Sequence, residues 1–304
     1  MTLALEQILN GFQFGIMLFL MAAGLTLIFG IMNVINLAHG SLYMIGAYGA
    51  ALVAARTGSF LLAVPAGLIA AALAGLVIEF LVIRKLYDRD HLQQVLATFG
   101  LILFINEGTT MLFGRTPLFV GMPAFLSGSV EIIPGIPYPT YRIAIMVVGL
   151  LVAFGLYLLV NKTRIGMLVR AGSTHREMVR ALGVDIRLLY TVVFALGALL
   201  AGLAGLMAGP LLAVQVGMGE QILITTFVVV VIGGVGSIRG AFYGALIVGL
   251  TDTILRAFLP GFLKTFMNAS EADALGAGLS SMGIYLVMAL VLLIRPQGLF
   301  HAQG

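Results

Sequence analysis

Long runs of apolar residues recur along the chain and leave few structures open to it. Stretches such as Phe60 to Ile83, Tyr141 to Val160 and Leu279 to Ile294 approach or reach the roughly 20 residues that a helix needs to cross a bilayer. Hydrophobic residues make up 61% of the sequence and charged residues only 9%, so lipid must solvate most of the chain. Strands of alternating polarity, which are typical of membrane barrels, do not occur, so the backbone must be satisfied within helices. The sequence therefore predicts an all-α, polytopic membrane helix bundle.

About 8–9 membrane segments are expected, including short or broken helices. The apolar segments span residues 10–31, 40–55, 60–83, 92–113, 141–160, 190–212, 222–235, 241–259 and 277–294. Segments 40–55 and 222–235 look too short to cross alone, and the sequence leaves open whether they cross or re-enter. Because only short loops separate the segments, residues 1–304 are expected to form a single transmembrane domain. Residues 1–10 carry no Lys or Arg, so the first apolar run is expected to be retained and not cleaved as a signal peptide.

The basic residues are divided unequally between the two sides of this bundle. If the N-terminus is outside, eleven Lys and Arg residues face inward and five face outward. The inward residues are Arg84, Lys85, Arg89, Lys162, Arg164, Arg170, Arg176, Arg180, Arg187, Arg239 and Arg295, and the outward ones are Arg56, Arg115, Arg142, Arg256 and Lys264. The positive-inside rule then predicts a multi-pass protein of a cytoplasmic-type membrane, with the N-terminus outside and the C-terminus inside. The basic residues thus report orientation, and no nucleic-acid partner is expected.

Two polar, glycine-containing stretches interrupt the apolar pattern, at Asn33–Gly40 and Gly233–Gly240. Irregular backbone persists at membrane depth only where protein or water satisfies it, so such breaks are the best sequence pointer to a solute pathway. The residues expected to border a translocation pathway are Asn33, Asn36, His39, Ser41, Tyr43, Gly233, Gly234, Gly236 and Ser237. The polar groups around His39 are suited to a zwitterionic or amide solute, and equally to the backbone of the broken helix itself.

The inner loop, at about residues 161–189, holds the clearest motif outside the membrane. Thr174 and Glu177 have the spacing of a capping box, and Gly183 can end the helix that follows, so a short helix is expected over His175–Leu182. Met178, Val179 and Leu182 are expected to share one apolar face of it. Such an amphipathic helix either lies on the membrane surface or docks in the groove of a partner, and the spacing leaves both open.

The sequence shows no motif for catalysis or for a bound cofactor. The Gly-Gly-Val-Gly-Ser stretch lacks the Gly-Lys-Ser/Thr ending of a nucleotide P-loop, so ATP binding by that device is not expected. Cysteine is absent, no arrangement of His, Asp and Glu has metal-ligand spacing, and no nucleophile stands beside a base. Gly236, Gly240 and Gly244 recur every four residues, which indicates helix packing. An enzyme is therefore not expected.

The main alternative from another class is an ion-gradient-driven secondary transporter of a small polar solute, which would need a carboxylate deep in the membrane. Glu79 is expected near an inner helix end, within reach of water. Glu107 with Arg115, and Asp252 with Arg256, are expected to form ion pairs. A passive channel and a membrane enzyme are the remaining alternatives, and the sequence lacks a repeated filter motif for the former.

Three stretches resemble a known family, and the resemblance runs nearly end to end. Asn33–Tyr48, NVINLAHGSLYMIGAY, and Gly233–Gly244, GGVGSIRGAFYG, resemble the two hallmarks of LivH-type permeases of the branched-chain amino-acid ABC transporter family. Gly166–Asp185, GMLVRAGSTHREMVRALGVD, is similar to the cytoplasmic coupling loop of that family. The resemblance implies a permease subunit of an importer for branched-chain or related amino acids, in a bacterial cytoplasmic (inner) membrane. The family also contains permeases for urea and short amides, so the solute is only inferred.

The resemblance also implies a set of partners. The chain would form half of a translocation pore beside a homologous LivM-type permease. Two cytoplasmic ATP-binding cassette subunits would bind the ATP, and an external solute-binding protein would deliver the solute, so this chain would hold no cofactor itself. The residues expected to couple it to the ATPases are Arg170, Ala171, Glu177, Arg180, Ala181, Leu182 and Gly183. No catalytic or metal-binding residue is implied.

Overall fold

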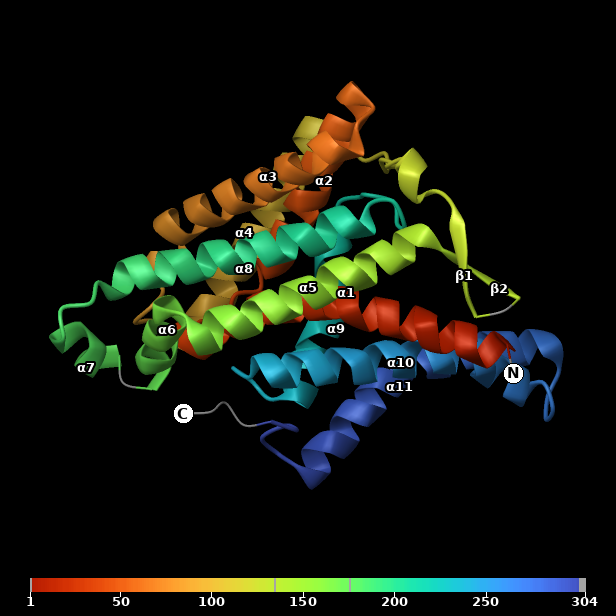
Figure 1. The fold of residues 1–304 in the computed structure, drawn as a ribbon. Coiled ribbons are helices and arrows are strands. Elements are labelled where there is room, and N and C mark those ends of the chain that lie inside the picture. Colours follow the sequence, from red (N-terminus) through yellow and green to blue (C-terminus); the bar gives the residue numbers. More distant parts are fainter. Residues whose placement is uncertain (1, 134, 175, 301–304) are drawn as a thin grey trace.

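The computed structural model describes residues 2–133, 135–174 and 176–300, and most of them lie in helices (Figure 1). Within these residues, seven helices are long and apolar enough to cross a membrane. They are α1 (Thr2–Met32), α3 (Phe60–Leu81), α4 (His91–Phe113), α5 (Thr140–Lys162), α8 (Ile186–Ala208), α10 (Ile238–Leu263) and α11 (Ala269–Ile294). The expected all-α membrane bundle is confirmed. The helices extend beyond several of the expected apolar segments, because hydropathy marks only the most apolar part of a helix.

Shorter elements complete the bundle. The helices α2 (His39–Thr57) and α9 (Met218–Gly233) correspond to the short segments expected at 40–55 and 222–235. The inner loop contains α6 (Arg164–Thr174) and α7 (Arg176–Ala181), and single 3₁₀ turns occur at η1 (Ile83–Lys85) and η2 (Ala124–Leu126). The strands β1 (Ser129–Ile133) and β2 (Ile136–Pro139) pair antiparallel. This small hairpin lies outside the bundle and was not predicted.

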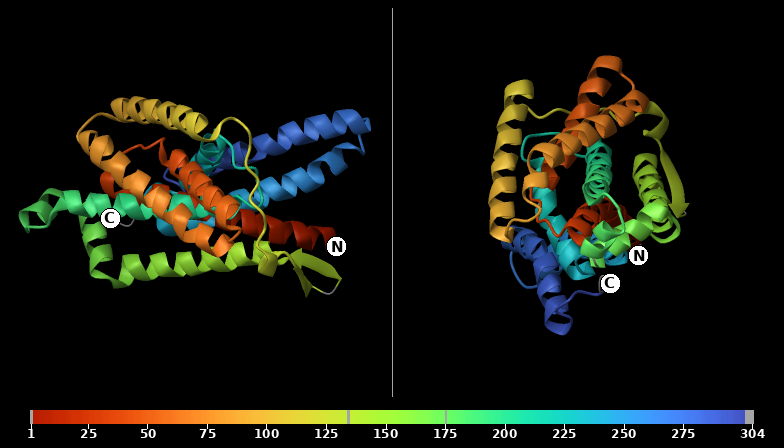
Figure 2. Two further views of the ribbon diagram at one scale, coloured as in Figure 1. Left: turned by 90° about the horizontal axis from the view of Figure 1, so that it is seen from above. Right: turned by 90° about the vertical axis from the view of Figure 1, so that its left-hand side faces the viewer.

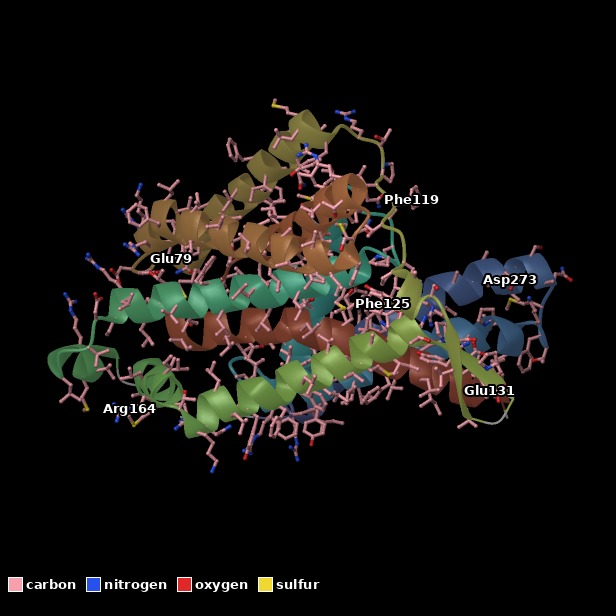
Figure 3. All side chains as sticks on the ribbon, turned by 45° about the horizontal axis from the view of Figure 1, so that its top comes forward. Glu79, Phe119, Phe125, Glu131, Arg164 and Asp273 are labelled. Carbon is pink, nitrogen blue, oxygen red and sulfur yellow. The ribbon has the colours of Figure 1, made fainter. Side chains whose placement is uncertain are left out.

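The bundle has two distinct ends. In Figure 1 the N-terminal end of α1, the β1–β2 hairpin and the α10–α11 turn lie at one end, and α6 and α7 lie at the other. Figure 3 shows Glu131 and Asp273 at the first end and Arg164 at the second. The end that carries α6 and α7 is called the inner end below, after the orientation that the basic residues predict.

Two helices form the centre of the molecule. In α1, 83% of the most apolar window is buried, and in α8 67%, against 17% in α4, α5 and α11. Seen from the inner end in Figure 2, α4 and α11 lie at the periphery of the bundle. The peripheral helices therefore present apolar side chains to lipid, while α1 and α8 carry the internal contacts.

Glycines let the central helices approach one another closely. A methyl group on Gly205 of α8 would overlap the Tyr43 carbonyl oxygen of α2, and one on Gly24 of α1 would lie 2.8 Å from the Gly197 carbonyl oxygen of α8. Gly240 and Gly244 pack against α9, which confirms the packing role predicted from their spacing. Backbone contact of this kind fixes how α1, α2 and α8 lie relative to one another.

We expect Gly205→Ala to destabilise the fold, because the added methyl group would force α8 away from α2. Overpacking of a well-packed interior costs about 1–3 kcal/mol, so thermal unfolding in detergent should occur at a lower temperature. Gly100→Ala on α4 is the matched control, since a methyl group there has no neighbour within 4 Å. A Gly205→Ala variant as stable as Gly100→Ala would contradict the close contact of α2 and α8.

Candidate functional site

The first break joins α1 to α2 over residues 33–38. Asn33 has a φ of 52°, a left-handed conformation that Asn tolerates, and its N–H donates to the Phe29 carbonyl oxygen at 2.9 Å, which ends α1. The Asn36 side chain is 0% exposed, and its Oδ1 accepts a hydrogen bond from the Ala38 N–H at 3.0 Å. The side-chain amide of Asn36 therefore accepts a hydrogen bond from the residue that directly precedes α2.

Two side chains of α4 satisfy the backbone of this break. The Ile35 N–H donates to Gln94 Oε1 at 3.1 Å, and the Leu37 N–H donates to Thr98 Oγ1 at 3.2 Å. Gln94 Nε2 in turn donates to the carbonyl oxygens of Leu86 and Arg89, in the turn that precedes α4. Gln94 and Thr98 are buried one helical turn apart on a helix that otherwise faces lipid. The sequence analysis missed them, although buried polar residues repeat along one side of segment 92–113.

Several buried polar atoms of the first break have no hydrogen-bond partner among the described residues. They are Asn36 Nδ2, both ring nitrogens of His39, and Ser41 Oγ. His39 lies against α1, where a methyl group on Gly24 would be 3.0 Å from its Nε2. Buried polar groups are costly unless they are paired, so these atoms are available to a polar solute or to water. Tyr43 lies one turn further along α2 and packs its backbone against α8.

The second break joins α9 to α10 over residues 234–237. Gly234 and Gly236 have φ values of 103° and 83°, which only glycine adopts readily. Ser237 caps α10, because its Oγ accepts a hydrogen bond from the Gly240 N–H at 3.1 Å. The last two carbonyl groups of α9 are satisfied by the segment after α11. Leu299 N–H donates to the Ile232 carbonyl oxygen and Phe300 N–H to the Gly233 carbonyl oxygen, both at 2.9 Å.

The two breaks are neighbours in the fold. A methyl group on Gly30, in the last turn of α1, would lie 3.0 Å from the Cα atom of Gly236. At the other side of the first break, the backbones of Gly40 and Gly219 are in contact where α2 and α9 begin. The structure thus brings together the two groups of residues that the sequence analysis assigned to a pathway. Tertiary contacts, which the sequence motifs do not reveal, close both breaks.

The inner loop differs from the single short helix that was predicted. It contains α6 and α7, and the side chains of Thr174 and Glu177, with the whole of His175, lie outside the described residues, so the capping box is not tested. Gly183 has a φ of 84°, and its N–H donates to the Arg180 carbonyl oxygen at 3.0 Å, which confirms that it ends α7.

Met178, Val179 and Leu182 were predicted to share one apolar face, and this prediction is wrong. Val179 is 5% exposed and packs inward, whereas Met178 and Leu182 are 61% and 78% exposed. A six-residue helix packs one side on the bundle, so its outward apolar side chains are left uncovered. Arg170 donates to the Val160 carbonyl oxygen at the end of α5. The other expected coupling residues that the structure describes, Ala171, Arg180, Ala181 and Gly183, are exposed.

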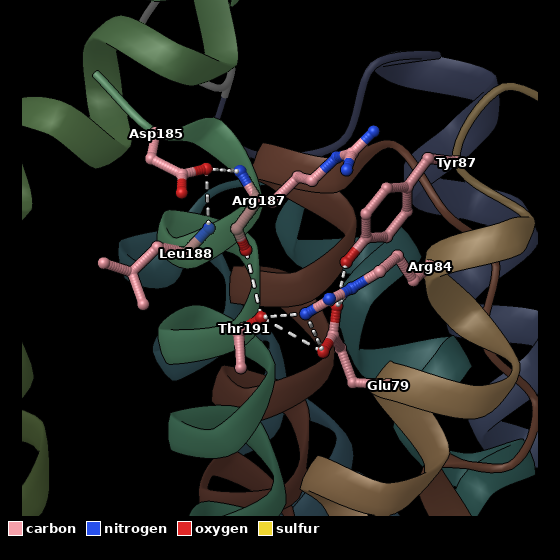
Figure 4. A network of polar contacts seen from close by, with 7 residues as sticks. All are labelled: Glu79, Arg84, Tyr87, Asp185, Arg187, Leu188 and Thr191. Carbon is pink, nitrogen blue, oxygen red and sulfur yellow. Dashed lines mark hydrogen bonds and ion pairs between the residues drawn. The ribbon is translucent and has the colours of Figure 1, made fainter. Parts of the chain in front are cut away.

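The membrane carboxylates are arranged partly as expected. Asp252 pairs with Arg256 at 2.8 Å, which confirms that pair. Glu79 was expected within reach of water, but its side chain is 0% exposed and is paired with Arg84 at 3.1 Å (Figure 4). Glu107 is exposed, and the ion pair expected with Arg115 is not formed in the described part of the chain. The helix end folds back through η1 and covers Glu79, which a linear pattern does not reveal.

The outer loops also make a contact that the sequence did not suggest. Leu118 and Val214 exchange backbone hydrogen bonds at 2.9 Å, which ties the segment after α4 to the turn between α8 and α9. Phe119 and Phe125, on the same loop, are 84% and 62% exposed and are labelled in Figure 3. This loop therefore exposes two aromatic side chains on the surface of the bundle.

Comparison with known proteins gives a consistent result. The family model described as "Branched-chain amino acid transport system / permease component" matches residues 7–294. The high-affinity branched-chain amino acid transport system permease protein BraD of Pseudomonas aeruginosa is 29% identical, over 97% of this chain and 95% of its own length. The corresponding protein LivH of Salmonella typhimurium is 27% identical, over 97% of this chain and 94% of its own. The ribose import permease protein RbsC of Escherichia coli is 28% identical, over 90% of this chain and 79% of its own length. No solved structure matches the chain.

We expect Gln94→Leu to lower the free energy of unfolding by about 1–3 kcal/mol, because it leaves the Ile35 N–H buried without an acceptor. Gln93→Leu is the matched control, since the neighbouring Gln93 side chain is exposed. Unfolding of both variants in detergent, followed by circular dichroism, measures the difference. Equal stability of the two variants would show that α4 does not hold the first break.

Proposed function

The chain belongs to the family of permease components of branched-chain amino acid transport systems, and from this premise we propose that it forms half of the translocation pore of an ABC importer for branched-chain or related amino acids. In this family ATP is bound by separate ATPase subunits and not by the transmembrane subunit. Family membership replaces the ion-gradient-driven secondary transporter as the interpretation of the chain. The partners that the family implies are ATPase subunits and a solute-binding protein.

Two further parts of the proposal concern partners and orientation. A homologous LivM-type permease would supply the other half of the pore. The N-terminus would lie outside and the C-terminus inside, as the excess of basic residues at the end that carries α6 and α7 supports. The aromatic outer loop around Phe119 and Phe125 would then face the solute-binding protein, and the inner loop would face the ATPases. The whole of residues 1–304 would act as one transmembrane permease domain.

The proposed substrate class rests on the relatives and on the chemistry of the first break. The two branched-chain amino acid relatives support an amino-acid solute, whereas the ribose permease shows that related chains serve other solutes. The uncapped start of α2, with the buried amide of Asn36 and ring of His39, offers hydrogen-bond donors that suit a carboxylate. Because Asn36 and His39 are 0% exposed, the pathway is closed here, and transport requires the helices around the break to separate.

The proposal of coupling to an ATPase rests on exposed apolar side chains in and directly after α7. Met178, in α7, and Leu182, in the turn directly after it, are exposed outside the apolar part of the bundle, on either side of the basic residue Arg180 in the sequence. Exposed apolar groups on a helix of this kind are typical of a segment that docks in a partner's groove. We assign the same role to Arg170, Ala171, Glu177, Ala181 and Gly183, as the sequence predicts.

A direct structural route leads from α7 to the first break. Asp185 caps α8, because its Oδ1 accepts hydrogen bonds from the N–H groups of Arg187 and Leu188 at 2.9 and 3.2 Å. At its other end α8 is in backbone contact with α2 at Tyr43. A movement of α7 driven by the ATPase would therefore act on α8 and, through it, on the helices that enclose the break.

We expect Leu182→Ala and Arg180→Ala to lower ATP-dependent uptake at least about tenfold, because each removes part of the contact with the ATPase. ATP hydrolysis and the amount of protein in the membrane should change little. Uptake is measured in proteoliposomes that contain the partner subunits, a binding protein and ATP, with an ionophore present to collapse ion gradients. Leu293→Ala is the control, because Leu293 is 85% exposed on the lipid side of α11. Normal uptake by both inner-loop variants would refute the coupling proposal.

We expect a cysteine at position 41 to react with a small aqueous thiol reagent at least about tenfold faster during turnover than at rest, because the break is closed in the resting structure. Ser41→Cys replaces a side chain that is 2% exposed and has no hydrogen-bond partner among the described residues. The chain contains no natural cysteine, so labelling is unambiguous. Ala63→Cys, at a buried position of α3 away from both breaks, is the control. Equal protection of both cysteines during turnover would contradict a pathway at the first break.

A further inference from the structure

A buried polar cluster lies where α3 ends at the inner side of the bundle (Figure 4). Glu79 belongs to the last turn of α3, and its carboxylate accepts hydrogen bonds from Arg84 Nε at 3.2 Å and Arg84 Nη2 at 3.1 Å. The Tyr87 hydroxyl donates to the same carboxylate. Burial, together with the hydrogen bond to Glu79, raises the pKa of the Tyr87 hydroxyl far above its ordinary value, so this donor keeps its proton. Arg84 and Tyr87, from the segment after α3, thus enclose a carboxylate that is 0% exposed.

One side chain connects this cluster to another helix. Thr191 Oγ1, on α8, lies 3.0 Å from Glu79 Oε2 and accepts a hydrogen bond from Arg84 Nη2 at 3.0 Å. The ring of Tyr87 also packs edge-on against the ring of Tyr190, with centroids 5.0 Å apart. Glu79, Arg84 and Tyr87 all belong to the end of α3 and the turn after it. The Thr191 hydroxyl therefore links Glu79 and Arg84 to α8 through hydrogen bonds.

The cluster is suited to fixing geometry more than to adding stability. A buried ion pair loses hydration, and apolar residues of similar size often stabilise as well or better, whereas the directional bonds specify one arrangement. Close packing already holds α3 to α8 further along, where a methyl group on Gly75 would overlap Ala198. The polar contact at the inner end therefore sets the position of the ends of these helices.

Both sides of the cluster lead to parts of the proposed mechanism. On α8, Thr191 lies less than two turns after Asp185, which ends the inner loop and caps the helix. On the other side, the turn that contains Arg84 and Tyr87 continues to α4. Gln94 of α4 donates to the carbonyl oxygens of Leu86 and Arg89 in this turn and accepts from the Ile35 N–H in the first break. Direct contacts thus run from the inner loop to the break.

We propose that Glu79, Arg84 and Thr191 form a polar latch through which movement of the inner loop reaches α4 and releases the first helix break. The inference rests on the proposed coupling of the inner loop to an ATPase, and it assigns positioning roles to these three residues. With the latch intact, α8 and the α3–α4 turn move together. Without the bond across to α8, the inner loop would move α8 alone, and ATP would be hydrolysed without the break opening.

Thr191→Val tests the latch, because it removes the hydroxyl but leaves Glu79 paired with Arg84 and Tyr87. The assembled transporter, with binding protein and ATP, is reconstituted in proteoliposomes, and the leucine taken up per ATP hydrolysed is measured. We expect this ratio to fall at least about fivefold in Thr191→Val, with unchanged unfolding temperature and ATP hydrolysis. Thr191→Ser, which restores the hydroxyl, should restore the ratio. Tyr87→Phe is the matched control, since it removes a bond to the same carboxylate that does not cross to α8, and it keeps the ring.

The outcomes distinguish failure of the latch from failure of inner-loop coupling, on which the latch rests. A normal ratio in Thr191→Val would overturn the latch, and so would an equal fall in Tyr87→Phe, which would indicate general loosening of the cluster. Leu182→Ala is measured in the same assay. If Leu182→Ala uncouples uptake and Thr191→Val does not, the latch is refuted and inner-loop coupling stands. If neither variant changes the ratio, inner-loop coupling itself is refuted.

Discussion

Backbone N–H and C=O groups in a membrane must find partners within the protein, and the arrangement of this bundle follows from that constraint. Continuous helices meet it by themselves, but two helices here are interrupted. At the first break, α4 supplies the acceptors Gln94 and Thr98, and at the second the segment after α11 supplies two N–H donors. Each break is therefore held by an element that is distant in the sequence. Release of that element would free backbone groups for a solute.

The same organisation is the basis of the proposed coupling, by which a chain without a nucleotide site would respond to ATP. The helix α8 begins at the inner loop, passes the Glu79 cluster and packs backbone to backbone against α2 at Tyr43. Glycines at the contacts leave little room for relative sliding, so displacement at one end is carried along the helix. Buried polar residues lie where such a movement would be received, at the first break, on the side of α4 that closes it and at the inner end of α3.

Much of the site could be predicted from sequence, but only where the signal is local. Asn33, Asn36 and Gly236 stand out because polar residues and glycine interrupt an apolar run, and Gly183 because it ends a short helix. Gln94 and Thr98 were missed, since a few polar residues in an apolar helix point to no particular partner. Glu79 was predicted to lie within reach of water but is buried. Met178 and Val179 were predicted to share one face but do not. Both depend on which neighbouring element covers the side chain.

The sequence by itself determined the membrane class, the approximate positions of the apolar helices, the positions of both breaks and the family, because hydropathy and short motifs act over neighbouring residues. Only the tertiary structure decided that α1 and α8 are central, that the two breaks are adjacent, and that α4 and the segment after α11 close them. These features depend on hydrogen bonds and close contacts between residues far apart in the chain. Hydropathy does not specify such pairs, because any buried donor can be satisfied by many different acceptors.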